Sequence, residues 1–141
     1  MATIFDVASY ILQKKGRMST WKLQKLCYYS QAWHLVWAEK PLFDEDFEAW
    51  SNGPVCRELF YKHKGIFLID KIEGNPDALT PAEKETIDTV LHDYGDMDAY
   101  ELRELTHSEA PWENARNGLG IGVPCDTVIT KDAIGEYYGG L

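Results

Sequence analysis

The longest helical pattern in the chain runs from Trp21 to Trp37, and apolar or aromatic side chains occur on every face of it. Ser19 and Thr20 stand just before this segment, where a hydroxyl oxygen can cap the free N–H groups of a helix. Charge within the segment is confined to Lys22 and Lys25. Because a helix that is apolar on all sides is normally buried, the pattern predicts a central helix around which the other elements pack.

One narrow polar row interrupts this apolar surface. Lys22, Lys25 and Tyr29 follow one another at spacings of three and four residues, which places them on one side of a helix. We therefore expect this row to be the part of the central helix that water or a partner protein reaches.

Several other segments combine helical spacing of apolar residues with a recognisable start. Thr80, Pro81 and Glu83 provide an N-cap, a proline at the first helical position and a capping glutamate, the clearest helix start in the chain. Thr3 and Asp6 provide a similar start near the N-terminus. Further helices are expected from Asp98 to His107, from Pro111 onward, and from Thr130 to Tyr138.

The pattern supports at most two strands, both short. Residues 47–50 alternate between apolar and polar side chains, which is typical of a strand with one buried face. Residues 66–69 are consecutively apolar and fit either a strand or an apolar plug. Between these segments Ser51 to Gly53 forms a turn, and Pro54 is expected at the first position of a helix that ends near His63.

These elements predict a mainly α fold: one compact domain covering residues 1–141, with about six helices and at most two short β-strands. A chain of 141 residues with 45% apolar content can bury one sizeable core. No apolar run approaches the roughly 18 residues that span a bilayer, and the N-terminus lacks the pattern of a signal peptide. Three widely spaced cysteines fit a reducing compartment, so we expect a cytoplasmic protein with no membrane partner.

Charge is unevenly distributed along the chain. The net charge is −9, yet residues 1–40 hold six basic and two acidic side chains, and residues 73–98 hold eight acidic side chains against Lys84 alone. An acidic protein gains little from the release of counterions that drives binding to nucleic acid. DNA or RNA is therefore disfavoured as the main partner, whereas a basic protein partner is compatible with this charge.

No motif for a metal, a cofactor or catalysis stands out. The four histidines lack the spacing of a metal site, and residues 118–122 lack the complete pattern of a nucleotide-binding loop. We expect no cofactor, no metal and no enzymatic activity. The alternative is a small hydrolase in which Cys27 or Cys56 acts as a nucleophile with His107, because a thiol needs a neighbouring base.

Two polar stretches are candidates for partner binding. The turn around Asn52 and Gly53 precedes an expected helix start, which presents free N–H groups to an anion or a carboxylate. His107 is followed by Trp112 across a proline turn, and Trp or Tyr side chains often anchor protein interfaces. The structural alternatives are that Asn52 caps a helix while Trp50 fills the core, and that the His107 ring bonds carbonyls at a helix end.

Several of these stretches occur together, and in order, in a known family. The shared elements are Met18-Ser19, Lys22 to Tyr29, Pro41-Leu42-Phe43, Glu48-Ala49-Trp50, Gly53-Pro54-Val55, Leu105-Thr106-His107 and Pro111-Trp112. With them, nearly the whole chain resembles the Panacea antitoxin domain, which is also called SocA-like and is related to phage-associated GepA-type proteins.

The resemblance implies a compact helical antitoxin that neutralises a toxin encoded beside it, in bacterial or prophage genomes, by direct protein contact. One member of the family is described as an adaptor that delivers its toxin to a AAA+ protease, which implies a second partner of that kind. The toxins paired with this domain are diverse, so the resemblance does not identify the toxin. The expected partner-binding residues are Lys22, Lys25, Tyr29, Trp50, Asn52, Gly53, Pro54, His107 and Trp112.

Overall fold

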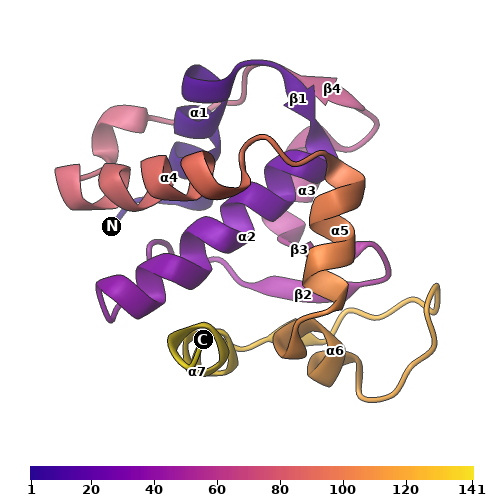
Figure 1. The fold of residues 1–141 in the computed structure, drawn as a ribbon. Helices are drawn as coiled ribbons and strands as arrows, with labels where there is room; N and C mark the ends of the chain where they lie inside the picture. The colour runs from indigo at the N-terminus through magenta and orange to yellow at the C-terminus, as the bar shows by residue number, and fades with distance from the viewer.

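The computed structural model describes all 141 residues and contains seven α-helices and five short strands (Figure 1). The helices are α1 (Ile4–Lys15), α2 (Thr20–Trp37), α3 (Arg57–His63), α4 (Pro81–Tyr94), α5 (Ala99–His107), α6 (Ala110–Arg116) and α7 (Lys131–Gly139), with a single 3₁₀ turn η1 (Pro76–Ala78). The strands are β1 (Met18–Ser19), β2 (Phe47–Trp50), β3 (Gly53–Val55), β4 (Leu68–Ile69) and β5 (Val128–Ile129).

The helix expected at the centre of the fold lies there. Helix α2 crosses the middle of the molecule in Figure 1 and contacts α1, α4, α5, α7 and β3. Twelve of its 18 residues are buried, because elements pack against it from several directions. Ser19 is its N-cap, and the Ser19 side chain accepts a hydrogen bond from the backbone N–H of Lys22. The absence of a wide polar face thus correctly indicated burial.

The capping signals also placed the helices correctly. Thr3 and Asp6 form a capping box at the start of α1, Thr80 and Glu83 form one at α4, and Asp98 caps α5. Thr130 caps α7 through the N–H of Ala133. These caps satisfy backbone donors within three or four residues, so local sequence is sufficient to predict them.

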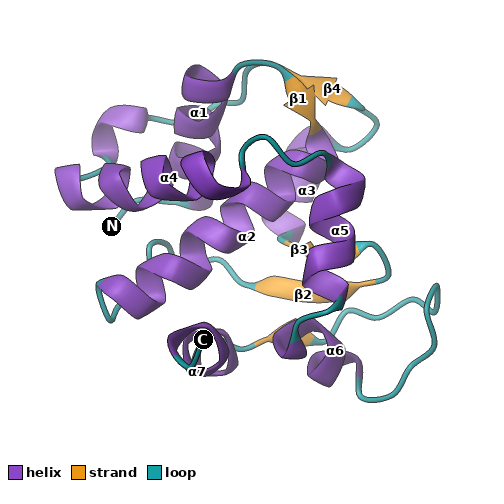
Figure 2. Cartoon of the chain, in the orientation of Figure 1, coloured by secondary structure: helices purple, strands orange, loops and turns teal.

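The expectation of at most two strands is wrong. Two small sheets are present: β1 pairs antiparallel with β4, and β2 lies between β3 and β5 in the order β3-β2-β5 (Figure 2). The strands β1, β4 and β5 have only two residues each. Such strands are too short to show a period of two, and their pairing partners are distant in sequence, so the fold is mainly α with a minor sheet component.

The helix start expected at Pro54 is also wrong. Residues 53–55 form strand β3, in which Pro54 pairs with Ala49 and Gly53 pairs with Trp50. Strand β3 is at the edge of its sheet, where a proline can be accommodated because its missing N–H need not serve the ladder. Helix α3 begins later, at Arg57, and no side chain caps it.

One hydrophobic core of 30 buried residues connects the helices and both sheets. It includes Leu23, Leu26 and Tyr28 of the central helix, Phe43 just before β2 and Phe47 in β2. Every other α-helix also contributes residues, although α3 contributes Leu59 alone. Helices α1 and α4 lie on one side of α2, and α6 and α7 lie on the other (Figure 1).

Candidate functional site

The polar row on α2 is not an open surface. Lys25 is 1% exposed and Tyr29 is fully buried, so the expectation that water reaches this row is wrong for these two residues. Lys22 is partly exposed, and its Nζ donates a hydrogen bond of 2.6 Å to the carbonyl oxygen of Gly95. The sequence could not show this, because α4, α5 and the β2–β3 hairpin cover the row from parts of the chain that are distant in sequence.

Lys25 lies beneath the β2–β3 hairpin with no hydrogen-bond partner for its amine. A Cβ atom at Gly53 would lie 2.5 Å from Cε of Lys25, so glycine is the residue that leaves room for this side chain. The ring of Trp21 is 5.6 Å from the amine. Burial, together with the positive charge of Arg103, lowers the pKa of Lys25 to about 7.

The turn of the hairpin exposes Asn52 and buries Gly53 and Pro54. Gly53 has a φ of +115°, a conformation that L side chains rarely adopt. Asn52 does not cap a helix, contrary to the structural alternative. Its Oδ1 accepts a long hydrogen bond of 3.4 Å from Nε of Arg103 on α5 instead.

His107, Trp112 and Arg116 form a stack on α5 and α6. The rings of His107 and Trp112 are 3.7 Å apart with an interplanar angle of 7°, and the Arg116 guanidinium lies 5.0 Å from the Trp112 ring. Nε1 of Trp112 donates to the carbonyl oxygen of Trp50, so the stack also holds the hairpin. Burial and nearby cations, chiefly Arg103, lower the pKa of His107 to about 4, which keeps the imidazole neutral at pH 7.

Arg116 is a structural residue that sequence reasoning missed. It is buried, and its guanidinium donates to the carbonyl oxygens of Ala49, Gly120 and Val123. These bonds join strand β2 to the glycine-rich loop after α6. No local pattern indicates such a role, because backbone carbonyls are the acceptors and any sequence supplies them.

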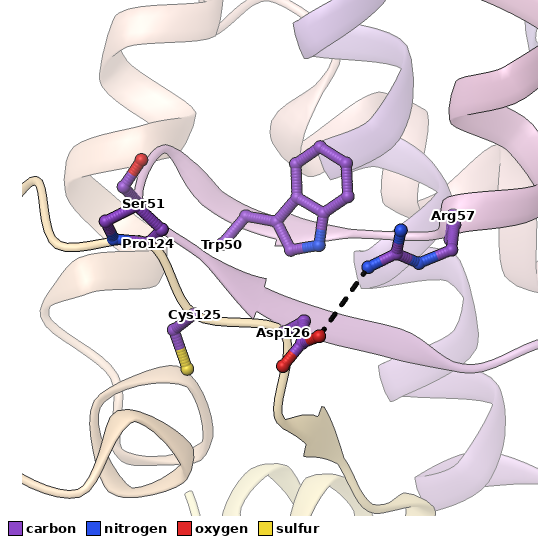
Figure 3. Close-up of a pocket in the computed structure, with 6 residues that line it drawn as sticks. All are labelled: Trp50, Ser51, Arg57, Pro124, Cys125 and Asp126. Atoms are coloured by element: carbon purple, nitrogen blue, oxygen red, sulfur yellow. Dashed lines mark ion pairs between the residues drawn. The ribbon is translucent and has the colours of Figure 1, made fainter.

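A pocket of about 400 Å³ opens between the hairpin and the segment before β5 (Figure 3). Its lining residues are Trp50, Ser51, Arg57, Pro124, Cys125 and Asp126. Arg57 holds Glu48 through two hydrogen bonds, of 3.1 and 2.8 Å, and lies 3.9 Å from Asp126. The guanidinium also lies 5.5 Å from the Trp50 ring, so an aromatic face and a cation border the same opening.

A second concavity of about 490 Å³ lies beside the stack. Its walls include His107, Trp112, Arg116 and the loop residues Leu119 and Ile121. Of the nine expected partner-binding residues, the hairpin and the stack bring together Lys25, Trp50, Asn52, Gly53, Pro54, His107 and Trp112. Most of them serve as internal supports of this region.

Tyr29 belongs to a different buried cluster. Its hydroxyl donates a 2.6 Å hydrogen bond to Oε1 of Glu109, and Tyr138 of α7 donates a 2.7 Å bond to the same oxygen. Burial raises the pKa of the Glu109 carboxyl. The cluster joins α2, the start of α6 and the C-terminal helix, so it attaches the end of the chain to the core.

Cys27 and Cys56 lack the environment of a nucleophile. Burial raises the pKa of Cys27 well above its usual value and that of Cys56 to about 12. A catalytic thiol needs the opposite shift, because the thiolate is the reactive form. His107 stacks on Trp112 and makes no hydrogen bond to either sulfur. The geometry therefore opposes a hydrolase built from these residues.

No group of three or more His, Cys, Asp or Glu side chains could hold a metal ion. None of the helices combines the length and hydropathy needed to cross a membrane.

Known proteins that are similar to the chain define its class. A model of the family described as antitoxin SocA-like, Panacea domain, matches residues 23–113, which include the hairpin and the His107–Trp112 stack. The chain belongs to this family of SocA-like antitoxins. It is 32% identical, over an alignment of 146 residues, to antitoxin SocA of Caulobacter vibrioides (strain NA1000 / CB15N), and this covers 87% of the chain and 78% of that protein. No solved structure matches the chain.

Proposed function

We propose that this protein neutralises a cognate toxin by direct protein contact. Membership of the SocA-like antitoxin family is the observation that carries the proposal. The burial and raised pKa values of Cys27 and Cys56 support binding over chemistry, because they oppose the one catalytic arrangement that the sequence suggested.

The buried residues of the expected site do not reach the surface, so they can affect partner binding only by holding the surface in its shape. Lys25, Tyr29, Gly53, Pro54 and Trp112 are buried, so we assign them to holding the hairpin and the helices in place. Lys22, Trp50, Asn52 and His107 retain exposed surface and remain the candidates for direct contact. Truncation of a central interface aromatic typically weakens binding by about 2 kcal/mol or more, which makes Trp50 the first residue to test.

The test is co-expression of this chain with the reading frame beside its gene. The neighbouring product alone should stop growth, growth should recover when this chain is present, and the two proteins should co-purify. A neighbouring product that is harmless by itself, or that fails to co-purify, would contradict the proposal. A AAA+ protease as second partner stays a prediction from the family resemblance, and it requires that this chain accelerates degradation of the bound toxin.

A further inference from the structure

An exposed apolar surface lies between α3 and β4, apart from the nine expected partner-binding residues. Ile66, Phe67 and Leu68 are consecutive and exposed, and Phe67 keeps 68% of its surface open to solvent. Tyr61 of α3 is 61% exposed. Single exposed apolar residues are ordinary, but adjacent ones of this size are characteristic of an interaction site. We call residues 61–68 the α3–β4 surface.

The backbone of this surface is fixed, although its side chains are open. The N–H of Thr20 donates to the carbonyl oxygen of Phe67 at 2.9 Å, and the Thr20 hydroxyl donates to that of Ile66 at 3.0 Å. The N–H of Ile66 donates to the carbonyl oxygen of His63, and Leu68 pairs with Ser19 in the β1–β4 ladder. The start of the central helix therefore holds the apolar side chains outward, a preorganised arrangement that lowers the entropy cost of binding.

The charge around this surface is opposite in sign to that of the whole chain. Residues 57–71 hold four basic and two acidic side chains, whereas the net charge of the protein is −9. Lys62, Lys64, Lys71 and Arg17 are exposed, and none of them forms an ion pair within the chain. Arg17 precedes β1, which pairs with β4, so it lies at the edge of the same surface.

Aromatic contacts connect the α3–β4 surface to the pocket beside Trp50. The Phe60 ring is 4.9 Å from the Trp50 ring and 6.5 Å from the Trp21 ring, and all three side chains are half-buried. Nη1 of Arg57 lies 3.4 Å from the Tyr61 hydroxyl, and Arg57 also lines the pocket (Figure 3). The outer side of α3 thus joins the apolar surface to a pocket with an aromatic wall.

We propose that the α3–β4 surface is where the toxin binds, through an apolar area of the toxin surrounded by carboxylates. This inference rests on the proposed function and identifies the surface and the chemistry of its partner. Unpaired lysines around exposed aromatic side chains complement such a partner in charge and in hydrophobicity. A protein partner is favoured over nucleic acid because the rest of the molecule is strongly acidic and would repel a phosphate backbone.

The test compares matched variants for binding to the purified product of the neighbouring reading frame. Tyr61→Ala and Phe67→Ala should each weaken binding roughly 30-fold, as expected for central aromatic anchors. Trp37→Ala is the control, because Trp37 is 50% exposed at the C-terminal end of α2, whereas Thr20, which holds the α3–β4 surface, is at the other end of this helix. It should leave the affinity within about twofold, since surface truncations outside an interface are near neutral.

Charge reversal provides a second comparison. Lys62→Glu combined with Lys64→Glu should reduce affinity about tenfold or more and should weaken its dependence on salt. Lys14→Glu combined with Lys40→Glu changes the net charge equally, but these residues lie outside the surface, so affinity should hold. Circular dichroism of every variant checks that the fold is intact.

A photo-crosslinking side chain detects direct contact with the toxin, independently of any effect that a substitution has on folding. Benzoylphenylalanine at position 67 should form a crosslink to the toxin, and at position 37 it should not. Equal binding by all variants, or crosslinking from position 37 alone, overturns the inference while leaving the antitoxin function standing. Phe67→Asp distinguishes two other uses of the surface. If the wild-type chain is a dimer and Phe67→Asp is a monomer, or if Phe67→Asp loses binding to single-stranded DNA while toxin binding stays intact, the inference is also overturned. If the wild-type chain does not bind the neighbouring product, the proposed function fails and this inference fails with it.

Discussion

Lys25 is a buried lysine, although lysine side chains are almost always exposed to solvent unless they are paired. Its amine has no hydrogen-bond partner and no neighbouring carboxylate, while Arg103, His63 and His107 are the ionisable groups around it. An amine in this position is costly to bury, and more so when it is charged. The side chain is therefore retained at the expense of stability.

Lys25→Met should stabilise the protein. The substitution keeps a chain of similar length and removes the unpaired amine, which should add about 1–3 kcal/mol to the free energy of unfolding at pH 7. Urea unfolding measures this change. Lys22→Met is the control, because it removes the bond to the Gly95 carbonyl and should lower stability by about 0.5–1.5 kcal/mol. Lower stability of Lys25→Met would show that the amine has a partner in the folded state.

The same variant should alter how stability depends on pH. The pKa of Lys25 is about 7 in the folded protein against 10.5 ordinarily, so between these values only the unfolded chain carries the proton. Unfolding free energy should therefore rise with pH from about 7 to 10.5, and this contribution is lost as pH falls toward 7. Lys25→Met should flatten the rise. An identical pH profile in both proteins would contradict the lowered pKa.

The three cysteines should react with iodoacetamide at different rates. Cys27 and Cys56 are buried and their pKa values are raised, so both should label slowly in the native protein. Cys125 is half-buried at the edge of the pocket and should label first. Mass spectrometry should find one early adduct, absent in Cys125→Ser. Rapid labelling of Cys27 or Cys56 would revive the hydrolase alternative.

At the scale of elements, the β2–β3 hairpin and helix α2 depend on each other. The hairpin turn covers Lys25, Thr106 lies close to the same point, and the Trp112 indole holds the carbonyl of Trp50. The β2–β3 hairpin is thus joined to three helices, α2, α5 and α6, through single contacts. Motif residues that are widely separated in the sequence of this chain therefore meet in one region of the structure.

Gly53→Ala should be strongly destabilising, and part of its cost should depend on Lys25. The new Cβ would lie 2.5 Å from Lys25 Cε, and the φ of +115° adds backbone strain. We expect a loss of about 3 kcal/mol, falling to about 1–2 kcal/mol when Lys25 is already alanine. Urea unfolding of the four proteins in this double-mutant cycle measures the coupling. Gly118→Ala, at a φ of +83° with no neighbour within 4 Å, reports the backbone part alone. If the losses of stability from Gly53→Ala and Lys25→Ala simply add in the double variant, the proposed clash between the new Cβ and the Lys25 side chain would be contradicted.

At the scale of the whole molecule, we propose that residues 1–141 form a single cooperative domain. The 30-residue core includes residues of all seven α-helices and of both sheets. The Glu109 cluster attaches the C-terminal helix α7 to α2. Neither the two small sheets nor the helices form a separate core. The acidic α4 region and the basic α3–β4 surface are then two regions of opposite charge on one rigid domain.

Unfolding should therefore be two-state. Urea transitions followed by tryptophan fluorescence and by far-UV circular dichroism should have the same midpoint, with a slope of about 1–3 kcal/mol per molar urea. The five tryptophans lie in α2, β2 and α6, so fluorescence reports on distant parts of the chain. Separate midpoints would show that the C-terminal helices unfold independently.

Local chemistry determined much of the fold. The caps at Thr3, Thr80, Asp98 and Thr130 act over three or four residues, and the apolar surface of α2 demands burial whatever covers it. The family motifs likewise indicated the class of protein. These features depend on neighbouring residues along the chain, so a pattern in the sequence is sufficient to reveal them.

Only the tertiary structure decided which residues face outward. Lys25 and Tyr29 had the polarity of surface residues, yet the β2–β3 hairpin covers Lys25, and Tyr94, Glu109 and Tyr138 surround Tyr29. Ile66 and Phe67 had the hydrophobicity of core residues, yet hydrogen bonds from Thr20 hold their backbone at the surface. Exposure depends on which distant segments pack together, and polarity along the chain constrains that packing without specifying it.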